Sequence, residues 1–127
     1  MMERLQMRYH HMGIPTTEPR EEESYLPAFG VHVTNHLSNP FRIQWMRYED
    51  DSTLPELVRA RPHIAFQVEK LEAALKGREL LIPPNSPSEG VRVAFIVHEG
   101  ALVEFLEFEP GHPDRLPEDR EEESFHG

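Results

Sequence analysis

The segment RPHIAFQVEK (residues 61–70) has a shorter counterpart near the start of the chain, YHHMGIP (residues 9–15). In both segments a histidine opens a short apolar run: His63 precedes Ile-Ala-Phe, and His11 precedes Met-Gly-Ile. Internal similarity of this kind indicates that one structural unit occurs twice in the chain. We therefore expect His11 and His63 to open equivalent strands.

A second pair of similar segments lies downstream of these histidines. FRIQWMRYE (residues 41–49) aligns without gaps with ALVEFLEFE (residues 101–109), so that Gln44 matches Glu104. Each unit thus begins with a histidine and ends with an amide or a carboxylate. The two histidines are 52 residues apart, whereas Gln44 and Glu104 are 60 residues apart. The first unit is therefore eight residues shorter, which predicts that it lacks either its helix or one strand.

Apolar periodicity predicts seven strands and one clear helix. Leucine and alanine recur at helical spacing in residues 69–76, and a glycine follows them as a stop signal. Alternating patterns and runs rich in β-branched and aromatic residues indicate the strands. These lie at residues 7–14, 30–35, 41–49, 63–68, 79–82, 91–97 and 101–108.

Three segments carry signals against regular structure. Residues 20–29 contain Pro27, which is unfavourable inside a helix, so we expect a loop or a broken helical turn there. Residues 83–90 contain three prolines and are expected to form a long turn. Residues 111–127 are acidic and almost free of apolar residues, which predicts a disordered acidic tail that adds nothing to the core.

Length and composition restrict the class of protein. A chain of 127 residues is expected to form one domain with a hydrophobic core. The net charge of −10 is unfavourable for binding nucleic acid. The absence of cysteine excludes disulfides and thiolate metal sites. No apolar run approaches the roughly 20 residues of a membrane span, and no signal peptide is evident. We expect a cytoplasmic protein that binds neither membranes nor nucleic acid.

The repeat predicts a metal site. If the two units pack about a local twofold axis, His11, Gln44, His63 and Glu104 meet near that axis. Two imidazoles and a carboxylate suit a divalent ion, with glutamine as a fourth, neutral oxygen ligand, but they do not distinguish Fe, Mn, Zn, Ni or Co. Glu104 lies in an apolar run, where its charge needs a cation. Because adjacent strand residues face opposite sides, only one of His10 and His11 can reach the site, and the alignment with His63 favours His11.

Other polar residues are candidates for contacts with a substrate. Arg42 and Tyr48 share the strand face of Gln44 if the strand is regular, so either side chain could orient a substrate, although ordinary packing in the sheet is the alternative. His32 and His36 could act as acid–base groups near the site or lie on the surface.

The motifs HHMGI (residues 10–14), HIAFQVEKLEAAL (63–75) and GALVEFLEF (100–108) resemble the vicinal oxygen chelate superfamily. This superfamily includes glyoxalase I, bleomycin-resistance proteins, extradiol dioxygenases and methylmalonyl-CoA epimerase. The resemblance implies an α+β domain over residues 1–110, in which two pseudo-symmetric βαβββ units form a cupped mixed sheet around a divalent metal. Unit one would span about residues 7–49, shortened, and unit two about residues 61–109.

The resemblance also implies a function. The ligand order His, Gln, His, Glu is similar to that of methylmalonyl-CoA epimerase, and it assigns His11, Gln44, His63 and Glu104 as metal ligands. We expect a small metal-dependent isomerase, lyase or dioxygenase that acts on a small oxygenated substrate, with Glu104 also taking part in catalysis. The alternative is a non-catalytic protein that binds a small ligand or an antibiotic. The small members of this superfamily commonly pair, so a homodimer is expected.

Overall fold

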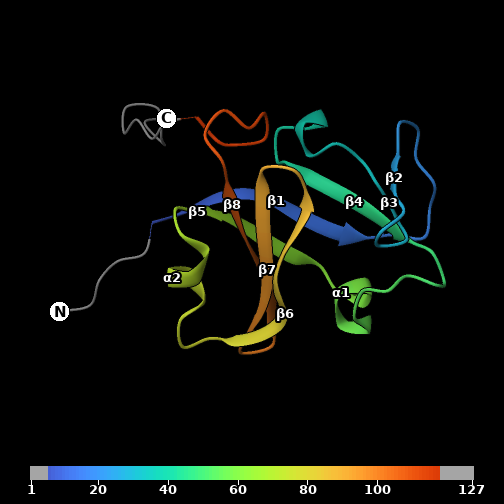
Figure 1. Cartoon of the computed structure of the whole chain (residues 1–127). Coiled ribbons are helices and arrows are strands. Elements are labelled where there is room, and N and C mark those ends of the chain that lie inside the picture. Colours follow the sequence, from blue (N-terminus) through green and yellow to red (C-terminus); the bar gives the residue numbers. More distant parts are fainter. Residues whose placement is uncertain (1–5, 118–127) are drawn as a thin grey trace.

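The computed structural model describes residues 6–117, which form one eight-stranded mixed sheet (Figure 1). This confirms the predicted α+β class and the cupped sheet. None of the described helices is long and apolar enough to cross a membrane. In chain order the elements are β1 (Met7–Pro15), β2 (Ser24–Leu26), β3 (Val31–Val33), the 3₁₀ helix η1 (His36–Ser38), β4 (Ile43–Tyr48), α1 (Glu56–Ala60), β5 (His63–Val68), α2 (Leu71–Leu75), β6 (Glu79–Ser88), β7 (Val91–His98) and β8 (Ala101–Phe108).

The strand order is β2-β3-β4-β1-β5-β8-β7-β6, and it is symmetric about its centre. In each half, the first strand of the unit runs parallel to the last one: β1 pairs with β4, and β5 pairs with β8. The third strand of each unit pairs antiparallel with the last one (β3 with β4, β7 with β8), and the second strand pairs antiparallel with the third at the edge of the sheet (β2 with β3, β6 with β7). β1 and β5 themselves pair antiparallel, so the pseudo-twofold axis passes between them.

The first unit is shorter because it has no helix and because its second and third strands are short. In the second unit α2 connects β5 to β6, whereas the described residues between β1 and β2 contain no helix. All four strands of unit one are present, although β2 and β3 have three residues each, against ten in β6 and eight in β7. The segment from His11 to the start of β2 is 13 residues long, against 16 from His63 to the start of β6, and the remaining stretch to Gln44 is 20, against 25 to Glu104. Unit one therefore lacks the helix and keeps every strand, but five of the eight missing residues come from its shorter strands and turns.

Two segments expected to be irregular contain strands. β2 lies within residues 20–29, where its three residues are all exposed at the edge of the sheet. β6 extends through the proline-rich residues 83–90 as far as Ser88. Its pairing with β7 shifts register three times, which is how an edge strand accommodates prolines that cannot donate to the ladder. Both expectations were wrong because pairing with a neighbouring strand overrode local turn signals.

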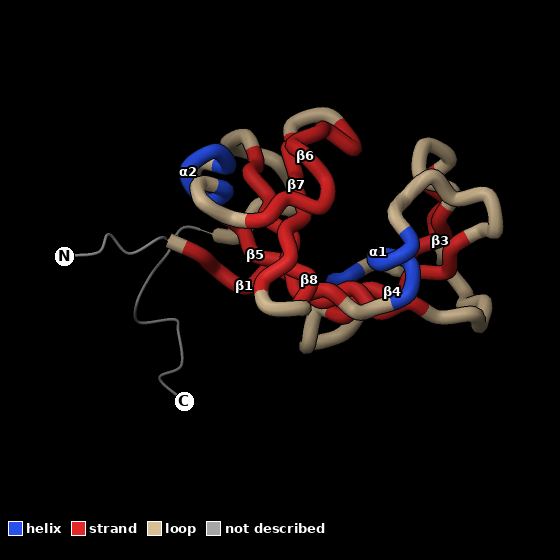
Figure 2. The backbone as a smooth tube through the Cα atoms, turned by 90° about the horizontal axis from the view of Figure 1, so that it is seen from below, coloured by secondary structure: helices blue, strands red, loops and turns tan. Residues whose placement is uncertain are grey.

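The sheet curls, so that it has an inner and an outer face (Figure 2). On the outer face of unit two, α2 buries Leu71 and Ala74 against Val68, Ile96 and Phe105. A second apolar cluster lies on the inner face and consists of Ala65, Val91, Val93, Leu106 and Phe108. The two clusters give unit two a core on both sides of its sheet, as expected for strands that carry no exposed face.

Polar contacts cover the outer face of unit one, where α2 has no counterpart. The guanidinium group of Arg47 donates to both carboxylate oxygens of Glu23, at 2.7 and 3.1 Å, and it lowers the pKa of Glu23 to about 2. Arg20 lies over the ring of Trp45, 4.3 Å from its centroid. His32 forms a 2.7 Å contact with Glu49 on this same face.

Residues 111–117 make defined contacts with the sheet, although they belong to the segment expected to be a disordered tail. The carbonyl oxygen of Pro117 accepts a hydrogen bond from Arg8, at 2.6 Å. The amide of Leu116 donates to the side chain of Gln67, at 2.8 Å. The carbonyl oxygen of Asp114 lies 2.7 Å from Nε2 of His10. The rest of the predicted tail, residues 118–127, lies outside the described residues.

These contacts predict that shortening the chain after Pro110 lowers its melting temperature. Three hydrogen bonds to β1 and β5 would be lost, and a loss of roughly 1 kcal/mol in a domain of this size lowers Tm by about 4 °C or more. Thermal unfolding followed by circular dichroism measures the change. A chain that ends at Pro117 is the control, because it keeps all three contacts. Equal melting temperatures for the two shortened chains would show that residues 111–117 do not stabilise the fold.

Candidate metal centre

The pairing of β1 with β5 places each of the two repeat histidines opposite a small residue of the other strand. His11 lies opposite Ala65, and His63 lies opposite Gly13. The parallel pairs continue these rows, since Ala65 is the register partner of Glu104 and Gly13 is that of Gln44. The two rows are therefore His11–Ala65–Glu104 and His63–Gly13–Gln44. This arrangement agrees with the alignment of Gln44 with Glu104 in the sequence.

Gly13 leaves the space that the imidazole of His63 occupies. A Cβ atom built on Gly13 would lie 2.2 Å from Cε1 of His63 and 2.7 Å from its Nε2. Carbon atoms in proteins do not approach this closely, so any side chain at this position displaces the ring. The HHMGI motif therefore needs a glycine at this position, because any side chain would occupy the space of the His63 ring from the other unit.

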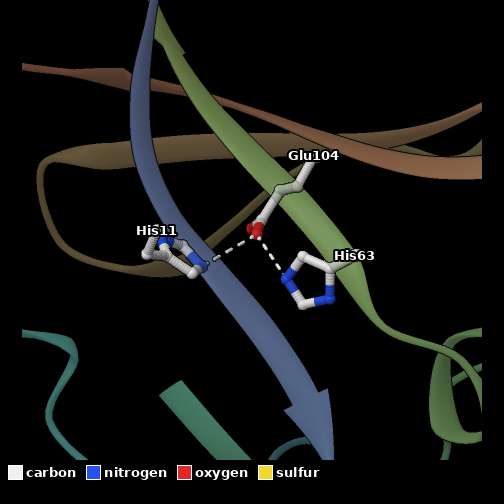
Figure 3. A group of neighbouring side chains, drawn as sticks. All are labelled: His11, His63 and Glu104. Carbon is white, nitrogen blue, oxygen red and sulfur yellow. Dashed lines mark ion pairs between the residues drawn. The ribbon is translucent and has the colours of Figure 1, made fainter. Parts of the chain in front are cut away.

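Three metal-binding side chains converge on the inner face: His11 from β1, His63 from β5 and Glu104 from β8 (Figure 3). Oε1 of Glu104 lies 3.1 Å from Nε2 of His63 and 3.5 Å from Nε2 of His11. All three residues are buried, with exposed fractions of 6% for His11, 3% for His63 and 8% for Glu104. One ligand atom from each lies within 4.8 Å of the others, a spacing that can hold a metal ion.

The electrostatics of the cluster fit a bound cation. Burial alone would raise the pKa of Glu104, but the two imidazoles beside it lower the pKa to about 2, so the carboxylate is ionised. Within the described part of the chain, Nε2 of His63 is buried without a hydrogen-bond partner, because its contact with Glu104 is not aligned for one. An unpaired buried nitrogen beside a buried carboxylate is unfavourable unless a cation binds both. The donor set of two imidazoles and one carboxylate suits a divalent metal.

Gln44 lies beside this cluster and lines the same cavity. Its Nε2 atom donates a hydrogen bond to the carbonyl oxygen of Thr34, at 3.2 Å. An amide that is held through its nitrogen presents its oxygen as the remaining polar atom, which is the atom that a metal ion requires.

His10 and His11 both face the inside of the sheet, which the alternation of strand residues did not predict. The register of β1 against β5 shifts between Tyr9 and His11, so His10 is the extra residue of a β-bulge. Both imidazoles line the cavity, and His10 is 2% exposed. The reason given for choosing between them, strand alternation, was therefore wrong, although His11 and not His10 is the histidine that joins His63 and Glu104.

The bulge connects the C-terminal segment to His11 through His10. The carbonyl oxygen of Asp114 can only accept, so Nε2 of His10 donates to it, at 2.7 Å. Burial lowers the pKa of His10 to about 4, so near pH 7 its Nδ1 carries a lone pair. Nδ1 of His11 lies 2.8 Å from Nδ1 of His10, so the nitrogen of His11 must carry the proton and donate it to this lone pair. The Nε2 atom of His11 is consequently the nitrogen that faces Glu104 or a metal.

The other sequence candidates lie at different places. Tyr48 lines the cavity, and burial raises its pKa above the ordinary value. Arg42 does not line the cavity, because its guanidinium group donates to the carbonyl oxygens of Tyr9 and His10. His36 lines the cavity with its ring 5.6 Å from that of His11. His32 is on the outer face, paired with Glu49.

The inner face encloses a cavity of about 460 Å³. Its wall is formed mainly by apolar side chains from both units, and the candidate metal ligands lie in it together with Gln44. Asp114 also lines it, although sequence analysis placed this residue in the tail. No local signal in the sequence marks Asp114, because its role depends on a contact with a residue more than 100 positions away.

Comparison with solved structures finds the same fold. A hypothetical protein from Bacillus halodurans C-125 matches with a TM-score of 0.59 and 19% identity over 89% of this chain and 99% of its own. Methylmalonyl-CoA epimerase from Mycobacterium tuberculosis matches with a TM-score of 0.60 and 20% identity over 87% of this chain and 94% of its own. The curled mixed sheet therefore fits the vicinal oxygen chelate fold. No protein-family model matches the sequence, and no curated protein matches it.

The close approach of Gly13 to His63 predicts the effect of Gly13→Ala. The added methyl group displaces the imidazole, and overpacking at a buried site costs about 1–3 kcal/mol. We expect a loss of stability of this size together with loss of bound metal. Ala65→Gly, at the equivalent position of unit two, removes a methyl group and is expected to keep the metal. Chemical denaturation and metal content measure the two effects, and a fully metal-loaded Gly13→Ala chain would contradict the role assigned to Gly13.

The contact between His10 and His11 predicts that His10→Phe weakens metal binding. Phenylalanine keeps a ring beside Phe108 but cannot accept the hydrogen bond from His11. Loss of such a supporting contact typically lowers metal affinity about 10–100-fold. Competition with a chromogenic chelator measures the affinity, and ¹⁵N NMR of the histidine rings reports the tautomer of His11 directly. His98→Ala is the control, because His98 is an exposed histidine in the β7–β8 hairpin.

An unchanged ¹⁵N pattern for His11 in the His10→Phe chain would contradict this account of the tautomer. A changed tautomer with unchanged metal affinity would show that the contact orders the ring without supporting a metal.

Proposed function

We propose that this chain is a small metal-dependent enzyme of the vicinal oxygen chelate type. His11, His63 and Glu104 would hold a divalent ion, and Gln44 would supply a neutral oxygen. When bound, the ion would polarise oxygen atoms of a small substrate. The observation that carries the proposal is that three buried side chains with metal-binding atoms converge from three strands. One of these atoms, Nε2 of His63, has no hydrogen-bond partner among the described residues.

The remaining inner-face residues have separate tasks in this proposal. His10 orients His11, as the hydrogen-bond pattern indicates. Tyr48 stays protonated because its pKa is raised, so it can donate a hydrogen bond to a substrate oxygen. His36 is a nitrogen base in the cavity wall and is a candidate for moving a proton. Arg42 orients no substrate in this arrangement, because its guanidinium group is held by the backbone of β1.

An isomerase is the reaction class that we favour. The similarity in fold to methylmalonyl-CoA epimerase supports it, and the cavity wall contains imidazole and phenol groups suited to proton transfer. Lyase and dioxygenase activities use the same kind of centre and are tested by the same loaded protein. The metal could be Fe, Mn, Zn, Ni or Co, since the ligand set suits each of them.

A non-catalytic protein that binds a small ligand is the alternative function. The apolar wall of the cavity favours it, because such a surface binds ligands without any reaction. Three buried ligands around a shared point argue against it, since a simple binding pocket gains nothing from a buried carboxylate between two imidazoles. A homodimer and a cytoplasmic location also remain proposals, and they rest on the resemblance and on composition.

Because Gln44 in unit one matches Glu104 in unit two, substitutions at these two positions are predicted to have opposite effects. Glu104→Gln removes the only anionic ligand, so metal affinity should fall by more than about 100-fold, exceeding the loss typical of a supporting residue. Gln44→Glu adds a second carboxylate, so metal should bind more tightly while becoming a weaker Lewis acid. Metal per chain, measured by plasma mass spectrometry after purification without chelators, tests both exchanges.

Two neighbouring exposed residues supply matched controls for the ligands. Glu99→Gln and His98→Ala lie in the β7–β8 hairpin, away from the cavity, and should keep the metal. His11→Ala and His63→Ala should each lose it. Equal metal content in the ligand variants and the two controls would contradict the proposed centre and leave ligand binding as the better function.

A further inference from the structure

We infer that the site takes a largely apolar ligand that carries no charge beyond the atoms that would meet the candidate metal ligands. The inference rests on the proposed metal centre and names its substrate class. It follows from the composition of the cavity wall, from the directions of the arginines around it, and from the placement of its polar groups.

Most of the side chains in the cavity wall are apolar, and they come from both units. Unit one contributes Val31, Val33 and Met46, and unit two contributes Val93, Phe95 and Leu106. Five of these six residues, all except Met46, are buried, with exposed fractions of 8% or less. A surface of this kind favours hydrocarbon over water, at about 25 cal/mol per Å² of apolar area covered.

The described residues that line the cavity include neither lysine nor arginine. Their acidic side chains are Glu104 and Asp114. A carboxylate or phosphate on the body of a ligand would therefore be buried without a cationic partner, which is strongly unfavourable. A ligand that is anionic only at its metal-binding atoms avoids this penalty.

Arg47, Arg59 and Arg92 adjoin lining residues in the sequence, and Arg42 lies two residues before Gln44, yet none of the four lines the cavity and each is held by another group of the protein. Strand alternation sends Arg47 and Arg92 to the outer face, because their neighbours on both sides face inward. The partners are Glu23 for Arg47 (2.7 Å), Glu72 for Arg92 (2.6 Å), the carbonyl oxygen of Leu54 for Arg59 (3.0 Å) and the carbonyl oxygens of His10 and Tyr9 for Arg42 (2.8 and 3.1 Å).

The titratable groups of the wall gather around the candidate metal ligands, whereas the polar residues Asn85 and Ser88 on β6 are neutral, and the amide of Asn85 donates to the carbonyl oxygens of Pro83 and Val93. His10 touches His11 through its ring nitrogen, and the ring of His36 lies 4.9 Å from that of His10. Asp114 contacts His10 through its carbonyl oxygen. Polarity is thus concentrated where a chelating group would sit. A ligand with one oxygen-rich end and an apolar body matches this distribution, and a ligand that places a second anionic group inside the cavity does not.

Two hydroxamic acids test this inference with the metal-loaded full-length chain. Octanohydroxamic acid and suberic monohydroxamic acid carry the same chelating group on the same six methylene groups, but the first ends in a methyl group and the second in a carboxylate. We expect octanohydroxamic acid to bind at least about tenfold more tightly in isothermal titration calorimetry, because the second compound must bury an unpaired charge. Equal affinities, or tighter binding of suberic monohydroxamic acid, would overturn the inference.

A cation added to the wall supplies the matched variant. Ile82 lines the cavity and is half-buried on β6, so Ile82→Lys can place an ammonium group at the rim without filling the core. The ratio of the affinity for octanohydroxamic acid to that for suberic monohydroxamic acid should fall at least about threefold, since the carboxylate of the second compound gains a cationic partner. An unchanged affinity ratio in a folded Ile82→Lys chain would show that the carboxylate of the ligand does not contact the cavity wall, which would also overturn the inference.

Metal content, measured in each sample, separates this inference from the proposed function. A chain that retains no metal under any loading condition contradicts the metal centre, whereas the ratio of the two affinities on the metal-free chain still reports the ligand class. Absence of binding by octanohydroxamic acid to loaded and metal-free chain alike would overturn the assignment of an apolar ligand.

Discussion

The antiparallel contact between β1 and β5 determines how the rest of the molecule is arranged. In this contact each histidine lies opposite a small residue of the other strand, His63 against Gly13 and His11 against Ala65. The parallel neighbours β4 and β8 then bring Gln44 and Glu104 alongside. A shift of register by one residue would turn the histidines to the outer face. The space left by Gly13 therefore fixes both the pairing of the two units and the position of the candidate metal ligands.

Much of the fold and the main ligands could be predicted because they follow from short-range patterns and from the repeat. The bounds of β5 and β8 match the expected ones, and the alignment identified His11, His63 and Glu104, which the structure brings together. The β-bulge at His10 and the role of Asp114 could not be predicted. Both depend on contacts between distant segments, and neither leaves a local pattern of hydrophobicity or turn residues.

The two units differ most where one of them lacks a helix. In unit two the outer face is sealed by α2, whereas in unit one it is covered by an ion pair between Arg47 and Glu23 and by Arg20 over Trp45. A polar cover stabilises a sheet less than a packed helix does, because exposed ion pairs contribute little. The inner face of unit one is therefore supported from the other side, through the pairing of β1 with β5 and through residues 111–117.

The neutral Gln44 and the apolar cavity are two parts of the same charge balance. With Glu104 as the only ionised ligand, a divalent ion in this centre would keep one net positive charge, and a second carboxylate at position 44 would have cancelled it. In a buried, weakly polar cavity the remaining charge attracts an anionic oxygen of the ligand strongly. One such oxygen neutralises the centre. Any further charge inside the cavity would find no lysine or arginine among the described lining residues, so the single carboxylate ligand and the wall favour the same kind of ligand.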